Sequence, residues 1–196
     1  MPQIFAISGL IALIVCIVSL VALHLLPGKF QPIRDPVSYY IASRYGRLYQ
    51  VQASASGISA FCLLAVFITL NVTLPVAGLI ALGCYGLARI CIVVFPADVH
   101  TTRTRSGIIH GILAVITFAS IATATGVLTN HIEALARWHE LVGWLDAANI
   151  LTFVASVLFL VVSIVRRLHP IMGVVERGIY VGGLLWLGLV LLFAVL

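Results

Sequence analysis

Residues 51–96 read VQASASGISAFCLLAVFITLNVTLPVAGLIALGCYGLARICIVVFP, two long apolar runs joined by a very short connection. Each run is long enough to cross a bilayer as a helix, because a span needs about 20 apolar residues. The connection, residues 71–75, is too short to cross the membrane itself, so the second run must start on the side where the first run ends. The two runs therefore form an antiparallel hairpin. Backbone groups in lipid must pair within their own segment, and this requirement predicts an all-helical fold.

The rest of the chain has the same character. Of its 196 residues, 62% are hydrophobic and 9% are charged, whereas soluble domains carry about 25% charged residues. We therefore predict an all-α polytopic membrane protein, a six-helix transmembrane bundle that forms a single domain over residues 1–196. The first apolar run is interpreted as a retained span, because no Lys or Arg precedes it as in a signal peptide. The expected spans are about 4–26, 51–72, 75–96, 107–128, 147–165 and 178–196.

The basic residues indicate an orientation. The first, third and fifth connections hold nine Lys and Arg, whereas the remaining connections and the two termini hold only Arg137. Short loops rich in Lys and Arg stay in the cytoplasm, so we expect both termini on the non-cytoplasmic side. These basic residues are scattered and lack an aromatic surface, which argues against nucleic-acid binding. The nine are Lys29, Arg34, Arg44, Arg47, Arg103, Arg105, Arg166, Arg167 and Arg177.

The fourth connection is longer and patterned. Its apolar residues recur at helical spacing, and Trp138 and Trp144 suit a membrane interface. These features predict an amphipathic helix over about 131–145 on the outer surface. His131 and His139 lie there without a convincing third metal ligand, so we interpret them as solvated side chains.

Ionisable residues inside or beside the spans gather at one depth. Arg89 lies about 10 Å inside the third span at 1.5 Å per residue, and the others lie near the same, cytoplasmic, ends of their spans. The depths predict one polar cluster at the cytoplasmic mouth of the bundle. Glycine pairs four residues apart, Gly107 with Gly111 and Gly178 with Gly182, would let helices approach closely there. The predicted members are Arg89, His110, His24, Asp98, Glu176 and Arg177.

The same residues also have an interpretation that requires no binding site. Arg89 could extend its guanidinium to the headgroups, and His110 could bridge helices. Residues 35–50, DPVSYYIASRYGRLYQ, hold four tyrosines and two arginines. That mixture is typical of an interfacial anchor, or of a lid over the cluster, which makes Tyr40 a further candidate ligand-binding residue.

The ordered motifs resemble those of the prokaryotic membrane family known as domain of unknown function 998. The resemblance implies a six-helix bundle in a prokaryotic cell (inner) membrane and points to His24, Asp98, His110 and Glu176, but it implies no activity. Ala97 stands where the family usually has a small polar residue. The motifs are LHLLPG at 23–28, PVSYY at 36–40, YG at 45–46, FPAD at 95–98, SGIIH at 106–110 and ER at 176–177.

Our preferred hypothesis is binding or transport of an anionic amphipathic ligand, such as a lipid, at the predicted cluster, because Arg recognises phosphate and carboxylate by a planar fork. We expect no catalytic residue, metal ligand or cofactor. The alternatives left open are an accessory structural subunit, a haem protein with His24 and His110 as ligands, and a zinc hydrolase built on Ser106 and His110 with Asp98 and His100. The oligomeric state stays open.

Overall fold

The computed structural model describes residues 2–70, 73–99, 103–132 and 141–196. Within them, six helices are long and apolar enough to cross a membrane, which confirms the predicted all-α six-helix bundle. The elements in chain order are α1 (Pro2–Leu25), η1 (Val37–Ala42), α2 (Gly46–Leu70), α3 (Val76–Cys91), η2 (Ile92–Val94), α4 (Arg105–Ile132), α5 (Val142–Ile164), η4 (Arg166–Ile171) and α6 (Met172–Val195).

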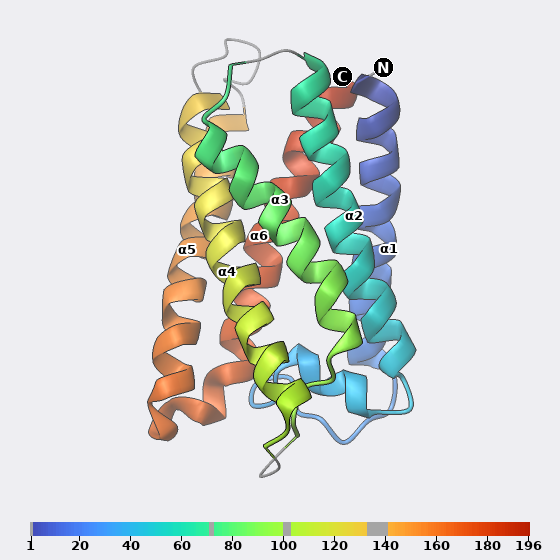
Figure 1. Cartoon of the computed structure of the whole chain (residues 1–196), viewed down its shortest axis with the longest axis vertical. Coiled ribbons are helices and arrows are strands. Elements are labelled where there is room, and N and C mark those ends of the chain that lie inside the picture. The colour runs from blue at the N-terminus through green and yellow to red at the C-terminus, as the bar shows by residue number, and fades with distance from the viewer. Residues whose placement is uncertain (1, 71–72, 100–102, 133–140) are drawn as a thin grey trace.

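The long helices run side by side, and both chain termini lie at one end of the bundle (Figure 1). The opposite end carries η1, the connection between α3 and α4, and η4. Consecutive helices pack against one another, and α6 also contacts α1, α2 and α4. The last helix therefore closes the bundle, and we call the end that carries η1 and η4 the basic end, because the first, third and fifth connections meet there.

Helix α1 turns most of its large side chains outward. Its buried residues recur every three or four positions, and besides Leu13 and Leu23 they are the small Ala6, Gly9, Cys16 and Ser19. In a bilayer the lipid tails are as apolar as leucine, so close approach of small residues, rather than hydrophobic exclusion, drives helix packing. The outward residues include Ile4, Ile7, Ile11, Ile14, Val18, Val21 and Leu25.

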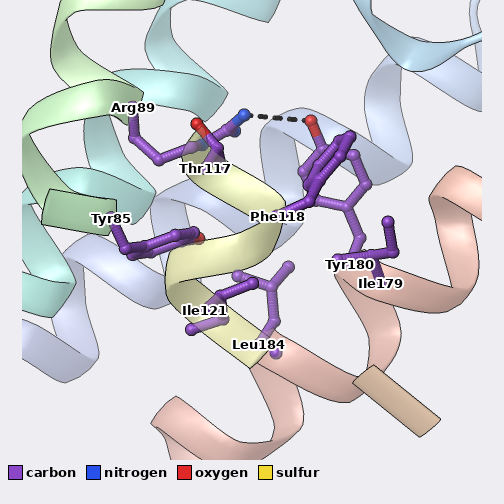
Figure 2. Close-up of a pocket in the computed structure, with 9 residues that line it drawn as sticks. Tyr85, Arg89, Thr117, Phe118, Ile121, Ile179, Tyr180 and Leu184 are labelled. Atoms are coloured by element: carbon purple, nitrogen blue, oxygen red, sulfur yellow. Dashed lines mark hydrogen bonds between the residues drawn. The ribbon is translucent and has the colours of Figure 1, made fainter. Parts of the chain in front are cut away.

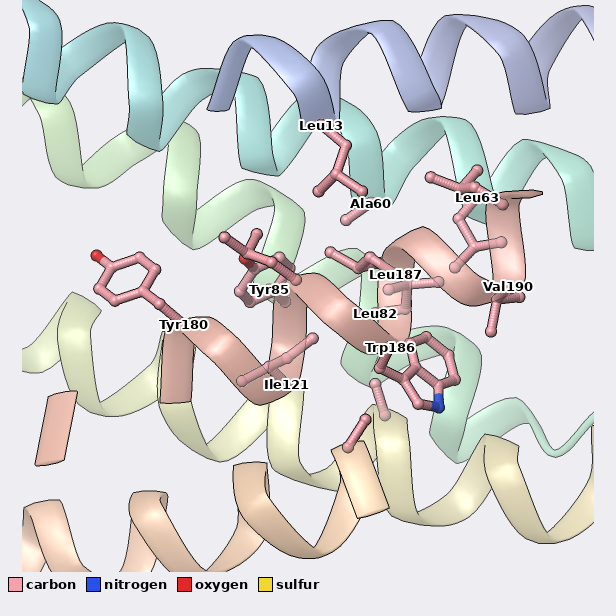
Figure 3. Packing of buried hydrophobic residues seen from close by; sticks show 14 of the residues in the cluster. Leu13, Ala60, Leu63, Leu82, Tyr85, Ile121, Tyr180, Trp186, Leu187 and Val190 are labelled. Carbon is pink, nitrogen blue, oxygen red and sulfur yellow. The ribbon is translucent and has the colours of Figure 1, made fainter. Parts of the chain in front are cut away.

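Helix α6 supplies the centre of the core (Figure 3). Trp186, Leu187 and Val190 are fully buried, and they pack with residues of the other helices such as Leu82 of α3. The indole Nε1 of Trp186 donates a hydrogen bond of 2.8 Å to Thr129 Oγ1 on α4. A buried indole N–H needs a partner, so this bond both satisfies Trp186 and joins α6 to α4.

Three spans begin five or six residues earlier than their composition predicts. Helix α2 starts at Gly46 rather than near 51, α5 at Val142 rather than near 147, and α6 at Met172 rather than near 178. The added turns of α2 and α6 carry Tyr49 and Glu176, both buried in the folded chain, and this tertiary burial is not visible in local hydropathy.

The predicted surface helix at about 131–145 falls mostly on 133–140, outside the described residues; its two ends belong to α4 and α5.

Only one of the two glycine pairs brings helices together. A Cβ at Gly182 would lie 2.8 Å from both the carbonyl O of Ala148 and the backbone N of Thr152 on α5. On α4, a Cβ at Gly107 would collide with the Asp98 carboxylate, and one at Gly111 would meet nothing within 4 Å. The pair on α6 therefore packs against α5 as expected, whereas the pair on α4 does not join two helices.

We predict opposite effects for two Gly→Ala substitutions inside spanning helices. Gly182→Ala should lower the free energy of unfolding by about 1–3 kcal/mol, because the methyl group overpacks the contact with α5. Gly111→Ala should raise it by up to about 1 kcal/mol, because alanine favours the helix and meets no neighbour. Thermal unfolding of both variants in detergent micelles checks the pair; equal effects would contradict the packing assignment.

Candidate functional site

Among the described residues, the most deeply buried charged side chain is that of Arg89 on α3, which is 1% exposed. Its Nε donates to Ser56 Oγ at 2.7 Å, its Nη2 to Gln52 Oε1 at 2.8 Å, and its Nη1 to the Tyr180 hydroxyl at 3.0 Å. Gln52 and Ser56 lie one turn apart on α2, and Tyr180 lies on α6. Arg89 thus joins three helices through hydrogen bonds to uncharged groups.

Two glycines allow this arrangement. A Cβ at Gly57 would lie 2.6 Å from the carbonyl O of Gly86 and 3.2 Å from the Arg89 Cβ. Helices α2 and α3 therefore approach closely beside Arg89, and its side chain can reach the α2 polar residues directly. Figure 2 shows Arg89 with Tyr180 and Tyr85 around a cavity of about 10 Å³, roughly the minimum space for one water molecule.

A second group joins α1, α6 and the segment that leads into η1. Arg177 Nε donates to His24 Nε2 at 2.7 Å, and His24 Nδ1 lies 2.6 Å from the carbonyl O of Leu20. A carbonyl only accepts and a guanidinium only donates, so His24 is neutral with its proton on Nδ1. The buried ring of Tyr40 packs against His24 with centroids 5.7 Å apart.

The same group includes the buried carboxylate of Glu176, whose Oε2 accepts a 2.6 Å hydrogen bond from the backbone N of Val37. Arg177 Nη1 donates to the carbonyl oxygens of Asp35 and Gly173 at 3.0 and 2.8 Å. Arg177 Nη2 is buried and has no hydrogen-bond partner among the described residues. These hydrogen bonds therefore join the first connection to α6, and Nη2 is the guanidinium nitrogen of Arg177 that they do not use.

A third group lies where α3 leads into α4. His110 is 5% exposed, and its Nδ1 lies 2.7 Å from the carbonyl O of Phe95. Its Nε2 is buried without a partner among the described residues. Asp98 Oδ2 accepts from the Thr104 backbone N at 2.9 Å, and Oδ1 accepts from Thr104 Oγ1 at 2.7 Å. Thr104 Oγ1 in turn accepts a hydrogen bond of 3.0 Å from the Gly107 N, and this bond caps the start of α4.

The structure thus distributes the seven predicted site residues over three groups near the basic end. His24, Tyr40, Glu176 and Arg177 form one group, His110 and Asp98 lie in another, and Arg89 is separate from both. Within the described ranges no hydrogen bond connects Arg89 with His110, Asp98 or Glu176. The residues that Arg89 does contact are Gln52, Ser56 and Tyr180, which the sequence analysis did not select.

Neither alternative cofactor site is favoured by these contacts. Both ring nitrogens of His24 take part in hydrogen bonds, so neither is free for a haem iron. In the part of the chain that the structure describes, no three His, Cys, Asp or Glu side chains are grouped as metal ligands. His100, a member of the hypothetical zinc set, lies outside the described residues.

The outer surface between α1 and α6 carries two adjoining apolar hollows, of about 540 and 270 Å³. They share Leu20, Val21, Tyr180 and Val181, so together they form one groove, which we call the α1/α6 groove. From Leu10 to His24 it follows α1 for ~21 Å at 1.5 Å per residue. Its end toward the basic end is lined by His24 and Arg177.

The six helices of the described residues that are long and apolar enough to cross a membrane define a multi-pass α-helical membrane protein. The chain belongs to the family described as "Protein of unknown function (DUF998)", which matches residues 10–192. This match confirms the family resemblance inferred from the ordered motifs. No curated protein and no solved structure matches the chain.

We predict that Arg89 is essential for stability. Arg89→Ala should lower the free energy of unfolding by about 3 kcal/mol or more, because it leaves buried polar partners on α2 and α6 unsatisfied. Tyr180→Phe removes one hydrogen bond and should cost about 1 kcal/mol. The exposed Arg166 provides the control, since Arg166→Ala should stay within about 0.5 kcal/mol. Thermal unfolding in detergent ranks the three; an Arg89→Ala protein as stable as the control would refute the role.

We also predict an acid-dependent loss of stability from Asp98. The two hydrogen bonds from Thr104 lower the pKa of this carboxyl below its usual 3.8. A group whose pKa is lower in the folded state stabilises the fold above its unfolded pKa, and that contribution is lost as pH falls through the folded value. Between pH 6 and pH 3, wild type should therefore lose more stability than Asp98→Asn. Parallel curves for the two proteins would contradict this prediction.

Proposed function

We propose that the protein binds an anionic amphipathic lipid in the α1/α6 groove, with the acyl chain along the apolar helices and the headgroup at Arg177. The observation that carries the proposal is the course of the groove, which is apolar along its length and reaches His24 and Arg177 at one end. A lipid is likewise apolar along its acyl chain and polar at its headgroup, so its two parts match the two parts of the groove. The proposal is for binding rather than transport, because the groove lies on the outside of the bundle and the cavity beside Arg89 is only about 10 Å³.

The unpartnered Nη2 of Arg177 supports an acceptor-bearing headgroup. A guanidinium has five N–H donors, and Arg177 uses three hydrogen bonds to His24, Asp35 and Gly173. A buried N–H group that makes no hydrogen bond lowers the stability of the fold by about 1–3 kcal/mol. A phosphate or carboxylate oxygen that reaches Nη2, after small movements of the enclosing side chains, would remove that cost. Arg89, in contrast, is occupied by its own helices and is not part of this site.

We further propose that the basic end faces the cytosol of a prokaryotic cell, in the inner membrane, with both termini on the other side. Lys and Arg gather in the connections at this end, as in cytoplasmic loops generally. Anionic lipids of the cytoplasmic leaflet are attracted to such loops. In this orientation the headgroup end of the groove would lie in that leaflet.

Native mass spectrometry of the gently solubilised protein tests the proposal, with phosphatidylglycerol and phosphatidylcholine as probes. Arg177→Gln should weaken binding of phosphatidylglycerol about tenfold or more, as expected for a lost hydrogen bond to a charged group. Phosphatidylcholine, whose phosphate is balanced by its own choline cation, should be weakened less. Arg166→Gln on the exposed η4 is the matched control and should behave as wild type.

A second pair of variants tests the groove itself and does not disturb the polar contacts. Val181 lines both hollows and is exposed, so Val181→Trp should fill the groove and reduce retention of both lipids. Val174→Trp places the same bulk on an exposed α6 residue that lines neither hollow, and should have no effect. If Val181→Trp and Arg177→Gln both retain lipid like wild type, the groove is not the binding site.

A further inference from the structure

The outer face of α4 carries a separate hollow of about 510 Å³. Gly107 and Gly111 contribute to its lining, and the side chains of Ile108 and Ile112 flank them. Asp98 and Arg103 lie at the end where α4 begins. The hollow is therefore apolar along the spanning helix and carries both signs of charge at the end where that helix begins.

The glycines explain why the face is concave. A Cβ at Gly111 would meet nothing within 4 Å, so this glycine is not required for packing inside the bundle. At Gly107 the Asp98 carboxylate occupies the place that a Cβ would need. The absence of both side chains leaves a depression between exposed isoleucines, Ile108 and Ile112.

Hydrogen bonds hold the Asp98 carboxylate in place at the charged end of the hollow. Thr104 holds both oxygens of Asp98 with its backbone N and its hydroxyl, at 2.9 and 2.7 Å. These bonds also lower the pKa of Asp98, so the carboxylate stays ionised at neutral pH. Arg103 is exposed and lines the same hollow. A purely anionic headgroup would be repelled by Asp98, whereas a headgroup with one charge of each sign complements the pair.

We propose that this hollow binds one phospholipid whose headgroup carries a primary ammonium and a phosphate, with the ammonium on Asp98, the phosphate on Arg103 and an acyl chain over Gly107 and Gly111. A primary ammonium donates hydrogen bonds to a carboxylate, which a quaternary ammonium cannot do. The arginine fork suits phosphate oxygens. The inference goes beyond the proposed function, because it concerns another helix and a zwitterionic ligand.

The test uses the full chain, freed of co-purified lipid, and phosphatidylethanolamine with a photoreactive acyl chain. Cross-links are mapped by peptide mass spectrometry, and we expect them within residues 105–116. Gly111→Leu should reduce this labelling about tenfold, because it removes contacts of about two methylene groups. Gly143→Leu is the matched control, since a Cβ at Gly143 also meets nothing within 4 Å. Labelling of α4 that is unchanged by Gly111→Leu would overturn the proposal.

The headgroup assignment is tested by competition against this labelling with unlabelled phosphatidylethanolamine or phosphatidylcholine. Wild type should prefer phosphatidylethanolamine, and Asp98→Asn should reduce that preference about two- to fivefold, the size of an exposed ion pair. Arg103→Gln should weaken both competitors, and Arg105→Gln, whose side chain does not line the hollow, should not. Equal competition by the two lipids in wild type would overturn the headgroup assignment. A dimer that is lost in Gly111→Leu would show that a second copy occupies the hollow instead.

Discussion

The structure depends on the requirement that polar groups in a bilayer find partners within the protein, because no water is available there. Arg89 meets this requirement through Gln52, Ser56 and Tyr180, contributed by α2 and α6. One charged side chain therefore sets how three helices lie around it. The close approach at Gly57 follows from the same contact, since α2 must come near α3 for its polar side chains to reach the guanidinium.

Lipid on the outside inverts the size pattern of a soluble bundle. Along α1 the large β-branched residues face outward and small residues face the core. Packing then relies on close backbone approach, as where Gly182 meets α5. Hollows arise on the outer faces where small residues have no helix to receive them, as at Gly111, or along the seam between two helices, as between α1 and α6.

Much of the fold could be predicted from the sequence because apolar length and loop charge are local properties. They gave the six spans, the hairpin and the basic connections. The partners of Arg89 could not be predicted, because depth fixes the height of a residue in the membrane and not its direction around the helix. Arg89, His110 and Glu176 lie near one end of the bundle, yet they face different neighbours. A usable signal was the spacing of Gln52, Ser56 and Ser59, which places three polar residues on one face of the second span.

Tyr180 separates the interior of the bundle from the α1/α6 groove on its outer surface. Its side chain lines the small cavity beside Arg89 and also the α1/α6 groove, and its hydroxyl holds the guanidinium. Any molecule that presses on this phenol from the lipid side also acts on the bond that joins α6 to α3. Occupancy of the groove and cohesion of the bundle are then thermodynamically linked, and each must influence the other to the same extent.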